Sequence, residues 1–444
     1  MNRKLHGVCV PHRKNTASLA AVRLPAPPVV TIPMSMHIGA PARPVVQAGD
    51  EVKVGQLIAE AGGFVSSPIY ASVSGKVKKL GELLGSNGRS MQTVVIESDG
   101  RMTPKEDLAA PKLDSLQDFL DAVRASGAVG LGGAGFPTAV KLTVKDPSQI
   151  KAVIVNGAEC EPYITSDTRT MLDRADDMMD GARLVQRFLG VGRIIFAIEN
   201  NKPQCIAKFR GLVKAEHGME VQALRSSYPQ GAEKVLIYHT TGGVVPEGKL
   251  PIDAGAIVLN CTTLALIGQY CRSGMPLVEK CITVDGSAVR EPKNVIVPIG
   301  ERMQDVFEAC GGFSEEPGKV LYGGPMMGIS VPDLEQPILK NTNAILAFSK
   351  KDAVLPEPTA CIKCGRCIAH CPLRLMPAEI ESAYTLGRMD LLEELKVNLC
   401  MECGCCSYGC PAHRPLVQTN KLAKAQLAAW QKLKKEQAEK EGAK

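Results

Sequence analysis

The first hundred residues alternate short apolar stretches with glycine-rich turns. Apolar runs of two to five residues, bounded by Gly, Asp and Ser, are typical of short β-strands. Turns are expected at Ala48–Asp50 and Ser74–Lys76. The pattern predicts a small β domain over residues 1–100. Its expected strands are Val45–Val46, Val52–Val54, Leu57–Ala59, Ile69–Ala71, Lys76–Val77 and Thr93–Glu97.

After a polar linker, residues 114–268 alternate between helical and strand periodicity. Such alternation predicts a parallel α/β layer. The expected strands are Ala152–Val155, Arg193–Ile198 and Ala256–Asn260. The expected helices are Leu116–Ala125, Met171–Leu189 and Lys202–His217.

The pattern changes twice more toward the C-terminus. The pattern of residues 276–345 predicts a strand, a turn, a second strand and a helix. The predicted strands are Cys281–Val284 and Asn294–Pro298, and the predicted helix is Arg302–Ala309. This order of elements resembles a β-grasp domain. Residues 416–444 form a Lys-rich tail with helical periodicity. In it Leu422, Ala425, Ala429 and Leu433 fall on one face, beside Leu427 and Trp430. We expect either a solvated terminal helix or one that docks on a membrane partner.

Composition narrows the function classes. Hydrophobic residues make up 45% of the 444 residues and charged residues 22%, as in globular proteins. Aromatic content is 4% and net charge +6, which indicates no nucleic-acid partner. No apolar run reaches the roughly 18 residues that cross a bilayer, and the N-terminus lacks a signal peptide, so membrane association is expected to be peripheral.

Nine of the 16 cysteines lie between Cys361 and Cys410. They include two runs of the form C-x-x-C-x-x-C-x-x-x-C-P, the ferredoxin spacing in which the fourth cysteine binds the other run's cluster. The prediction is two [4Fe–4S] clusters in a ferredoxin-like domain over residues 355–415. Their ligand sets are Cys361, Cys364, Cys367 and Cys410 for cluster one, and Cys400, Cys403, Cys406 and Cys371 for cluster two. Structural zinc and disulfides fit this spacing poorly, and Cys405 is out of register as a ligand.

A glycine-rich loop runs from Gly130 to Thr138. Its glycines let backbone N–H groups approach and cradle a phosphate, Pro137 suits the start of a helix, and Lys141 can add a positive charge. The segment before it is helical, which disfavours an ordinary dinucleotide fingerprint. The alternative is a tight structural turn.

A second polar segment, Asn156–Tyr163, follows the strand Ala152–Val155. Ligands of open α/β sheets bind at the carboxyl ends of strands. Asn156 is therefore a candidate for the edge of a flavin, and Glu159 and Glu161 are candidates for ribose or nicotinamide groups.

These residues resemble known families. Residues 49–77 resemble a lipoyl or biotinyl barrel-sandwich domain, but the hairpin tip Glu60–Gly63 lacks the carrier lysine, which favours a structural role over a swinging arm. The glycine-rich loop, Asn156–Pro162, Tyr228–Glu233 and Asn260–Leu264 resemble the flavin and NADH motifs of the flavin-carrying subunit of respiratory complex I. The order of domains, with Gly323–Gly328, resembles the RnfC family of Rnf electron-transport complexes over nearly the whole chain.

The resemblance implies a fold and a set of ligands. The fold is multidomain α/β and α+β: an N-terminal barrel-sandwich hybrid, a Rossmann-like FMN/NADH domain, an SLBB-type β-grasp domain, a ferredoxin-like two-cluster domain and a C-terminal helix. Implied catalytic residues are Glu159, Glu161 and Phe136. Implied FMN and NAD(H) contacts are Gly130, Gly132, Gly133, Gly135, Phe136, Thr138, Lys141, Asn156, Glu159, Glu161, Tyr228, Gly231, Glu233, Asn260, Thr262 and Thr263.

The resemblance also implies a function. The chain would be a peripheral subunit on the cytoplasmic face of the membrane that exchanges electrons between NAD(H) and membrane-embedded redox subunits, with ferredoxin reached through a partner and coupling to Na⁺ or H⁺ pumping. FMN would convert hydride transfer into single-electron steps. Leu131, Ala158, Leu142 and Val144 depart from the complex I pattern and make nicotinamide stacking less secure than phosphate binding.

Two alternatives remain. The cobalamin reductase of bacterial microcompartments shares the motifs but places its barrel-sandwich segment after them. A non-catalytic electron-transfer scaffold would have lost its flavin, against which the intact Gly130–Lys141 and Glu159 argue.

Overall fold

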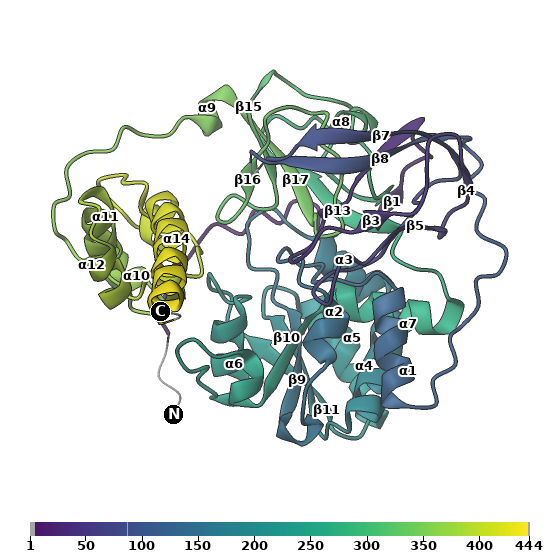
Figure 1. Ribbon diagram of the computed structural model, residues 1–444, viewed down its shortest axis with the longest axis horizontal. Coiled ribbons are helices and arrows are strands. Elements are labelled where there is room, and N and C mark those ends of the chain that lie inside the picture. The colour runs from purple at the N-terminus through teal and green to yellow at the C-terminus, as the bar shows by residue number, and fades with distance from the viewer. Residues whose placement is uncertain (1–4, 87, 443–444) are drawn as a thin grey trace.

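The computed structural model describes residues 5–86 and 88–442. The barrel-sandwich, flavin and β-grasp regions form one body, and the cysteine-rich segment forms a helical lobe beside it (Figure 1). No described helix is both long and apolar enough to cross a membrane.

A four-stranded parallel sheet forms the centre of the flavin region. Its strand order is β11-β10-β9-β12, so the chain steps outward twice from β9 and then returns to the other side of β9. The strands are β9 (Ala152–Gly157), β10 (Ile194–Glu199), β11 (Met219–Leu224) and β12 (Ala256–Asn260). The reversal puts a topological switch point between β9 and β12, where ligands of open α/β sheets bind.

Helices cover both faces of this sheet, which explains why its strands are continuously apolar. Alternate residues point to opposite faces. Val153 and Val155 pack toward α4 and α7, whereas Ala152 and Ile154 pack toward α6. The helices are α1 (Leu116–Ala125), α2 (Thr138–Leu142), α3 (Ser166–Asp173), α4 (Ala175–Leu189), α5 (Pro203–Leu212), α6 (Glu233–Thr241) and α7 (Cys261–Ser273), with 3₁₀ turns at Pro147–Gln149, Val213–Ala215 and Pro251–Ala254.

The predicted helix Leu116–Ala125 is confirmed to the residue, because Ser115 and Asp118 form a capping box at its start. The single helix predicted over Met171–Leu189 is wrong. Arg174 leaves helical geometry (φ −125°, ψ 32°), so α3 ends at Asp173 and α4 begins at Ala175. Lys202–His217 is also too long, because the α-helical part ends at Leu212.

The barrel-sandwich region contains a four-stranded sheet and a three-stranded sheet. Its strands are β2 (Val29–Pro33), β3 (Arg43–Pro44), β4 (Glu51–Val52), β5 (Leu57–Glu60), β6 (Ile69–Tyr70), β7 (Gly75–Leu84) and β8 (Ser90–Ser98). β7 and β8 form a longer hairpin than predicted. The tip at Gly62 packs against the chain: a Cβ there would lie 1.9 Å from the oxygen of Pro41.

The β-grasp region is a six-stranded mixed sheet with one helix, α8 (Met303–Ala309). Its strands are β13 (Glu279–Asp285), β14 (Lys293–Pro298), β15 (Pro317–Tyr322), β16 (Ile329–Ser330), β17 (Ala344–Ser349) and the short β1 (Val22–Arg23). β1 pairs in parallel with β14, so the chain upstream of β2 runs along other regions before the barrel-sandwich begins.

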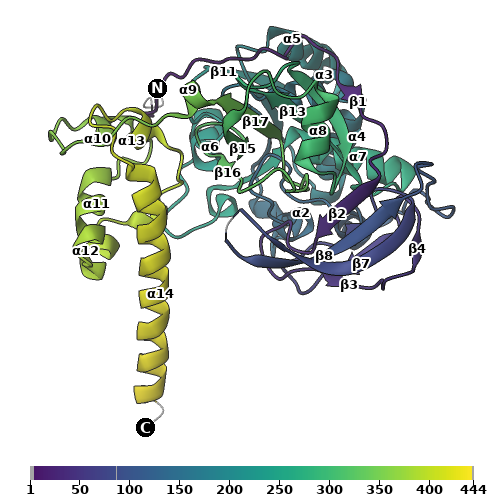
Figure 2. The same ribbon diagram turned by 90° about the horizontal axis from the view of Figure 1, so that it is seen from above.

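The cysteine-rich lobe is helical, and its last helix, α14, projects away from the body (Figure 2). Its elements are α9 (Lys350–Ala353), α10 (Arg366–His370), α11 (Pro377–Thr385), α12 (Met389–Glu394), a 3₁₀ turn at Val397–Leu399, α13 (Cys405–Tyr408) and α14 (Leu416–Gly442). α14 packs on α11 and α12 through Ala423 and Leu427. Leu422 and Leu433, on the apolar face noted in the sequence, are more than half exposed; whether that face is only solvated or docks on a partner stays a prediction.

One buried cation joins three regions. The Lys340 ammonium is fully enclosed and donates to Ser67 Oγ (3.1 Å), the Pro68 oxygen (2.6 Å) and the Gly127 oxygen (3.0 Å). No carboxylate is within ion-pair distance of it in the described residues. Burial lowers the Lys340 pKa from 10.5 to about 7.

This lowered pKa predicts a pH-dependent stability. Between about pH 7 and 10.5 the unfolded chain binds a proton at Lys340 that the folded chain lacks, so folding stability rises with pH. The contribution is up to about 1.4 kcal/mol per pH unit. Urea unfolding midpoints of the parent and of Lys340→Met, measured from pH 6.5 to 10, should diverge in the parent's favour as pH rises. Midpoints that run parallel across that window would contradict the assignment.

Candidate functional site

The candidate site lies at the switch point, where the last residues of two neighbouring strands stand side by side. Asn156 at the end of β9 pairs in register with Asn260 at the end of β12. Asn260 also caps α7, because its Oδ1 accepts hydrogen bonds from the N–H groups of Thr262 (3.0 Å) and Thr263 (3.2 Å). The predicted strand-end location of the two asparagines is therefore observed.

The glycine-rich loop joins α1 to α2 beside these strand ends. Gly132, Gly133 and Ala134 are exposed, and nothing in the described chain accepts a hydrogen bond from their three consecutive N–H groups. Successive free N–H groups of this kind form an anion-binding concavity. The loop thus has the property that a phosphate requires.

Glycine is required here for two different reasons. A Cβ on Gly132 would lie 2.7 Å from Nδ2 of Asn260, so the loop approaches that side chain closely. Gly133 has φ +130°, a backbone conformation that other residues rarely adopt. Pro137 is the residue before α2 rather than its first residue, and α2 is only five residues long.

Lys141 lies next to the carboxyl end of β12. Its Nζ donates to Glu233 Oε1 at 2.7 Å and to the oxygen of Val258 at 3.1 Å. Lys141 and Glu233 are about one-third exposed, so the ion pair borders solvent. Phe136 is partly exposed, whereas Thr138 is buried at 2% exposure.

The segment after β9 is tied to the segment before α6. Asn156 Nδ2 donates to the Gly231 oxygen at 3.0 Å, and Asn156 Oδ1 accepts from the N–H of Ala158 at 3.1 Å. The Gly231 N–H donates to Cys160 Sγ at 3.3 Å. These contacts bring Asn156 and Gly231, which are far apart in sequence, to one place as the motifs predicted.

Glu159 caps a helix. Its carboxylate accepts from the N–H groups of Asp167 (2.6 Å) and Thr168 (3.3 Å) at the start of α3, and from Thr168 Oγ1 (2.5 Å). Burial raises the pKa of this carboxyl, while the charges of Lys14 and Lys202 oppose that rise. Glu159 itself has φ +48°, an unusual conformation for this residue type.

Glu161 connects the flavin region to the β-grasp region. Its carboxylate accepts from the N–H groups of Met326 (3.0 Å) and Met327 (2.9 Å) and from the Tyr228 hydroxyl (3.4 Å). Burial raises its pKa, and the backbone N–H groups oppose the rise. The structure thus gives both predicted catalytic glutamates partners within the protein, while their catalytic roles stay predictions.

Four further predicted residues have hydrogen-bond partners within the protein. Thr263 Oγ1 donates to the Val129 oxygen and accepts from the Leu131 N–H, both at 3.0 Å. Thr262 Oγ1 donates to Asp167 Oδ1 at 2.7 Å. Gly130 and Gly135 close the loop through a backbone bond of 3.0 Å, and Gly135 has φ +66°.

Several functional side chains had no sequence signal. Lys14 donates to the oxygens of Glu159, Glu161 and Ile164 at 2.6–2.8 Å, and Lys202 donates to the Ala158 oxygen at 2.6 Å. Asp167 joins Asn260 to Thr262. Because a lone lysine in a polar segment resembles any surface lysine, periodicity and spacing give no indication of such contacts.

In the helical lobe, one cavity is lined by Cys371 from the first run and by Cys400, Cys403, Cys405 and Cys406 from the second. Three N–H groups donate to sulfurs there: Leu375 N to Cys371 (3.3 Å), and Glu402 N (3.4 Å) and Asn420 Nδ2 (3.6 Å) to Cys400. N–H donors to sulfur and a thiol-lined hollow fit an iron–sulfur cluster.

The other four cysteines lie nearer the surface. Cys361 and Cys364 are exposed, and Cys367 and Cys410 pack together near Leu416. In the described chain, no three Cys, His, Asp or Glu side chains already converge as a closed metal site. Cys405 is fully buried beside Cys403, and its thiol faces the oxygen of Tyr228 at 3.8 Å.

Comparisons with known proteins match these regions. Residues 3–101 match the RnfC barrel sandwich hybrid domain, residues 123–269 the Nuo51 FMN-binding domain, and residues 281–330 the SLBB domain. One chain of an NAD⁺-reducing [NiFe]-hydrogenase aligns with TM-score 0.50 and 20% identity, covering 72% of this chain and 64% of that one, which is a likeness of fold alone. The predicted multidomain fold class is confirmed.

Curated relatives extend along most of the chain. It is 43% identical over 389 residues to the C subunit of the proton-translocating ferredoxin:NAD⁺ oxidoreductase complex of Clostridium ljungdahlii, covering 86% of this chain and 84% of that protein. It is 41% identical to the C subunit of the Na⁺-translocating complex of Acetobacterium woodii, covering 95% and 96%. It is 37% identical to the C subunit of the ion-translocating oxidoreductase complex of Rhodobacter capsulatus, covering 95% and 82%. The predicted resemblance is therefore confirmed: the chain belongs to the RnfC family, the C subunits of ion-translocating oxidoreductase complexes.

Proposed function

We propose that this chain is the NAD(H)-interacting subunit of an ion-translocating ferredoxin:NAD⁺ oxidoreductase. It exchanges a hydride with NAD(H) at FMN and passes single electrons through two [4Fe–4S] clusters to partner subunits. The observation that carries the proposal is the row of three free N–H groups at Gly132–Ala134, which stands at the switch point beside Asn260.

Those N–H groups fit the phosphate of FMN, whereas Lys141 is paired with Glu233 on the edge of β12. Asn156, Asn260 and the Tyr228–Glu233 segment line the same strand ends and would hold the rest of the molecule. When bound, FMN supplies the conversion between two-electron and one-electron chemistry. The protein's part is to bind and orient it.

NAD(H) requires an open face beside the flavin. Phe136 is partly exposed at the end of the glycine-rich loop and is the ring we propose for contact with the nicotinamide. Glu159 and Glu161 shape the turn after β9 through the helix cap on α3 and the bonds to Met326 and Met327. We therefore assign these two glutamates to positioning that turn.

The two clusters differ in their position relative to the flavin region. Cys403 and Cys405 pack with Tyr228, Cys160 and Met326, so cluster two adjoins the flavin region. The Cys361 and Cys364 end is exposed. We propose that cluster two exchanges electrons with FMN and that cluster one faces the redox partner.

The partners we propose are the other subunits of the complex, with ferredoxin reached through one of them, on the cytoplasmic face of the membrane. Membership of the RnfC family and the barrel-sandwich region ahead of the flavin region favour this assignment over a microcompartment cobalamin reductase. The free N–H row favours it over a scaffold without flavin.

The activity is testable on the full chain. After reconstitution with FMN, iron and sulfide, NADH should reduce ferricyanide at a rate that depends on bound FMN. The measurement is ferricyanide bleaching, with flavin and iron content determined on the same sample. Absence of NADH-dependent reduction in a sample that contains flavin and both clusters would refute the dehydrogenase function.

Gly132→Ala tests the flavin site. The new Cβ would strike Nδ2 of Asn260, which cannot move freely because it donates to Asp167 Oδ2 at 2.7 Å. Overpacking of this kind costs about 1–3 kcal/mol, so FMN should bind about 5- to 150-fold more weakly where this cost falls on the binding conformation of the loop. The readout is quenching of flavin fluorescence. Gly211→Ala, in open space on α5, is the matched control and should leave FMN affinity unchanged; equal affinity in both variants would contradict the site.

Crossed ligation predicts which cysteine variants resemble each other. Cys371→Ser should lower iron from about eight to about four atoms per chain and leave the same paramagnetic resonance spectrum as Cys400→Ser. If each run bound its own cluster, the spectrum of Cys371→Ser would instead match that of Cys361→Ser. Cys405→Ser should retain both clusters, because Cys405 faces the Tyr228 oxygen.

A further inference from the structure

The glycine-rich loop is held from outside the flavin region by its carbonyl oxygens. Lys280 Nζ, from β13, donates to the Leu131 oxygen at 2.9 Å. Asn341 Nδ2 donates to the Gly133 oxygen at 2.7 Å, and Asn343 Nδ2 reaches the Gly132 oxygen at 3.5 Å. All three side chains come from the β-grasp region.

The backbone geometry gives these contacts a consequence for ligand binding. In a trans peptide the C=O of one residue and the N–H of the next point in opposite directions. Fixing the oxygens of Leu131 and Gly133 therefore fixes the N–H groups of Gly132 and Ala134 on the opposite side. These belong to the same row of N–H groups that has no partner in the described chain.

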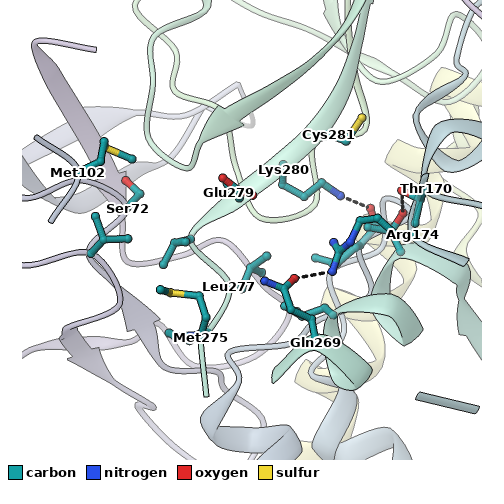
Figure 3. Close-up of a pocket in the computed structure, with 16 residues that line it drawn as sticks. Ser72, Met102, Thr170, Arg174, Gln269, Met275, Leu277, Glu279, Lys280 and Cys281 are labelled. Carbon is teal, nitrogen blue, oxygen red and sulfur yellow. Dashed lines mark hydrogen bonds between the residues drawn. The ribbon is translucent and has the colours of Figure 1, made fainter. Parts of the chain in front are cut away.

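The ammonium of Lys280 makes this contact in a buried position, where it loses most of its hydration. It is 3% exposed and borders a cavity of about 210 Å³, where Arg174 and Gln269 lie opposite (Figure 3). Within the described chain, the Leu131 oxygen is the one hydrogen-bond partner of the Lys280 ammonium, and no carboxylate pairs with that ammonium. An enclosed ammonium is unfavourable unless hydrogen bonds or an opposite charge compensate for its lost hydration. The bond to the loop is the one contact that explains it.

We propose that Lys280 and Asn341 are positioning residues through which the β-grasp region orients the glycine-rich loop toward the phosphate of a bound flavin. The proposal rests on the flavin site proposed above. It gives the β-grasp region a defined role: its side chains take the loop's oxygens so that the loop's N–H groups are available to an anion.

The test measures FMN affinity in the full chain by quenching of flavin fluorescence. Lys280→Met and Asn341→Ala should each weaken FMN binding about fivefold, as expected for one lost hydrogen bond. Asn341→Asp keeps the shape but places an acceptor against the Gly133 oxygen, so it should weaken binding more than Asn341→Ala. Because Asp also adds a negative charge, Asn341→Leu, which keeps most of the bulk without the donor, is measured beside them: weakening equal to that of Asn341→Ala distinguishes loss of the hydrogen bond from loss of packing.

The matched control is Gln336→Ala. Gln336 also belongs to the β-grasp region and donates to a backbone oxygen of another region, that of Leu84 at 3.1 Å, rather than to the glycine-rich loop. The substitution should lower the thermal midpoint of the flavin-free chain while leaving FMN affinity unchanged. If Lys280→Met prevents folding, the partly exposed Asn341 still carries the test.

Three outcomes separate the claims. Weakened FMN binding in the order given, with the control unaffected, supports the inference. The inference is overturned, with the flavin site left intact, if Lys280→Met and Asn341→Ala both bind FMN within twofold of the parent. Where Lys280→Met does not fold, the same result for Asn341→Ala and Asn341→Asp overturns it. Failure of the parent chain itself to bind FMN overturns both the inference and the proposed function.

Discussion

The structure depends on which donors form hydrogen bonds with the backbone oxygens at the switch point. A loop that offers its N–H groups to a ligand must turn its carbonyl oxygens elsewhere, and buried oxygens without partners are costly. Here long side chains from other parts of the chain supply the donors. Lys14 and Lys202 hold the turn after β9, Lys280 and Asn341 hold the glycine-rich loop, and Lys340 holds the Gly127 oxygen just before that loop.

This arrangement explains why the barrel-sandwich and β-grasp regions accompany the flavin region. Lys340 donates to both the Pro68 oxygen and the Gly127 oxygen, and the Ile38 N–H donates to the Gly135 oxygen at 3.0 Å. Glu161 accepts two N–H groups from the β-grasp loop at Met326. Met326 of that loop in turn packs against Cys403, so the proposed flavin site and the proposed second cluster border the same loop.

The sequence predicted those features that depend on interactions between residues close in sequence. The capping box of α1, the apolar strands β9 and β12, and the cysteine spacing depend on residues close in sequence. The break at Arg174 was missed because the apolar periodicity continues across it. The packing of α14 on α11 and α12 through Ala423 and Leu427 was not predicted, because the sequence pattern does not show which neighbouring helices a terminal helix will meet.

Long-range contacts could not be predicted in the same way. Lys14 lies 145 residues from Glu159 in sequence, and Asn341 lies 208 from Gly133. The motif residues Asn156 and Asn260 were placed correctly at the strand ends, whereas the partners of Glu159 and Glu161 were not foreseen. A carboxylate after a strand has the same sequence pattern whether it binds a ligand or caps a helix.

The central claim is that electrons pass from NADH through FMN to the clusters of this chain. The most direct measurement adds NADH to the cluster-loaded chain, with and without FMN, and follows cluster reduction by low-temperature paramagnetic resonance. The account predicts reduced-cluster signals only in the FMN-loaded sample. Equal cluster reduction without FMN, or none with FMN bound, would contradict it.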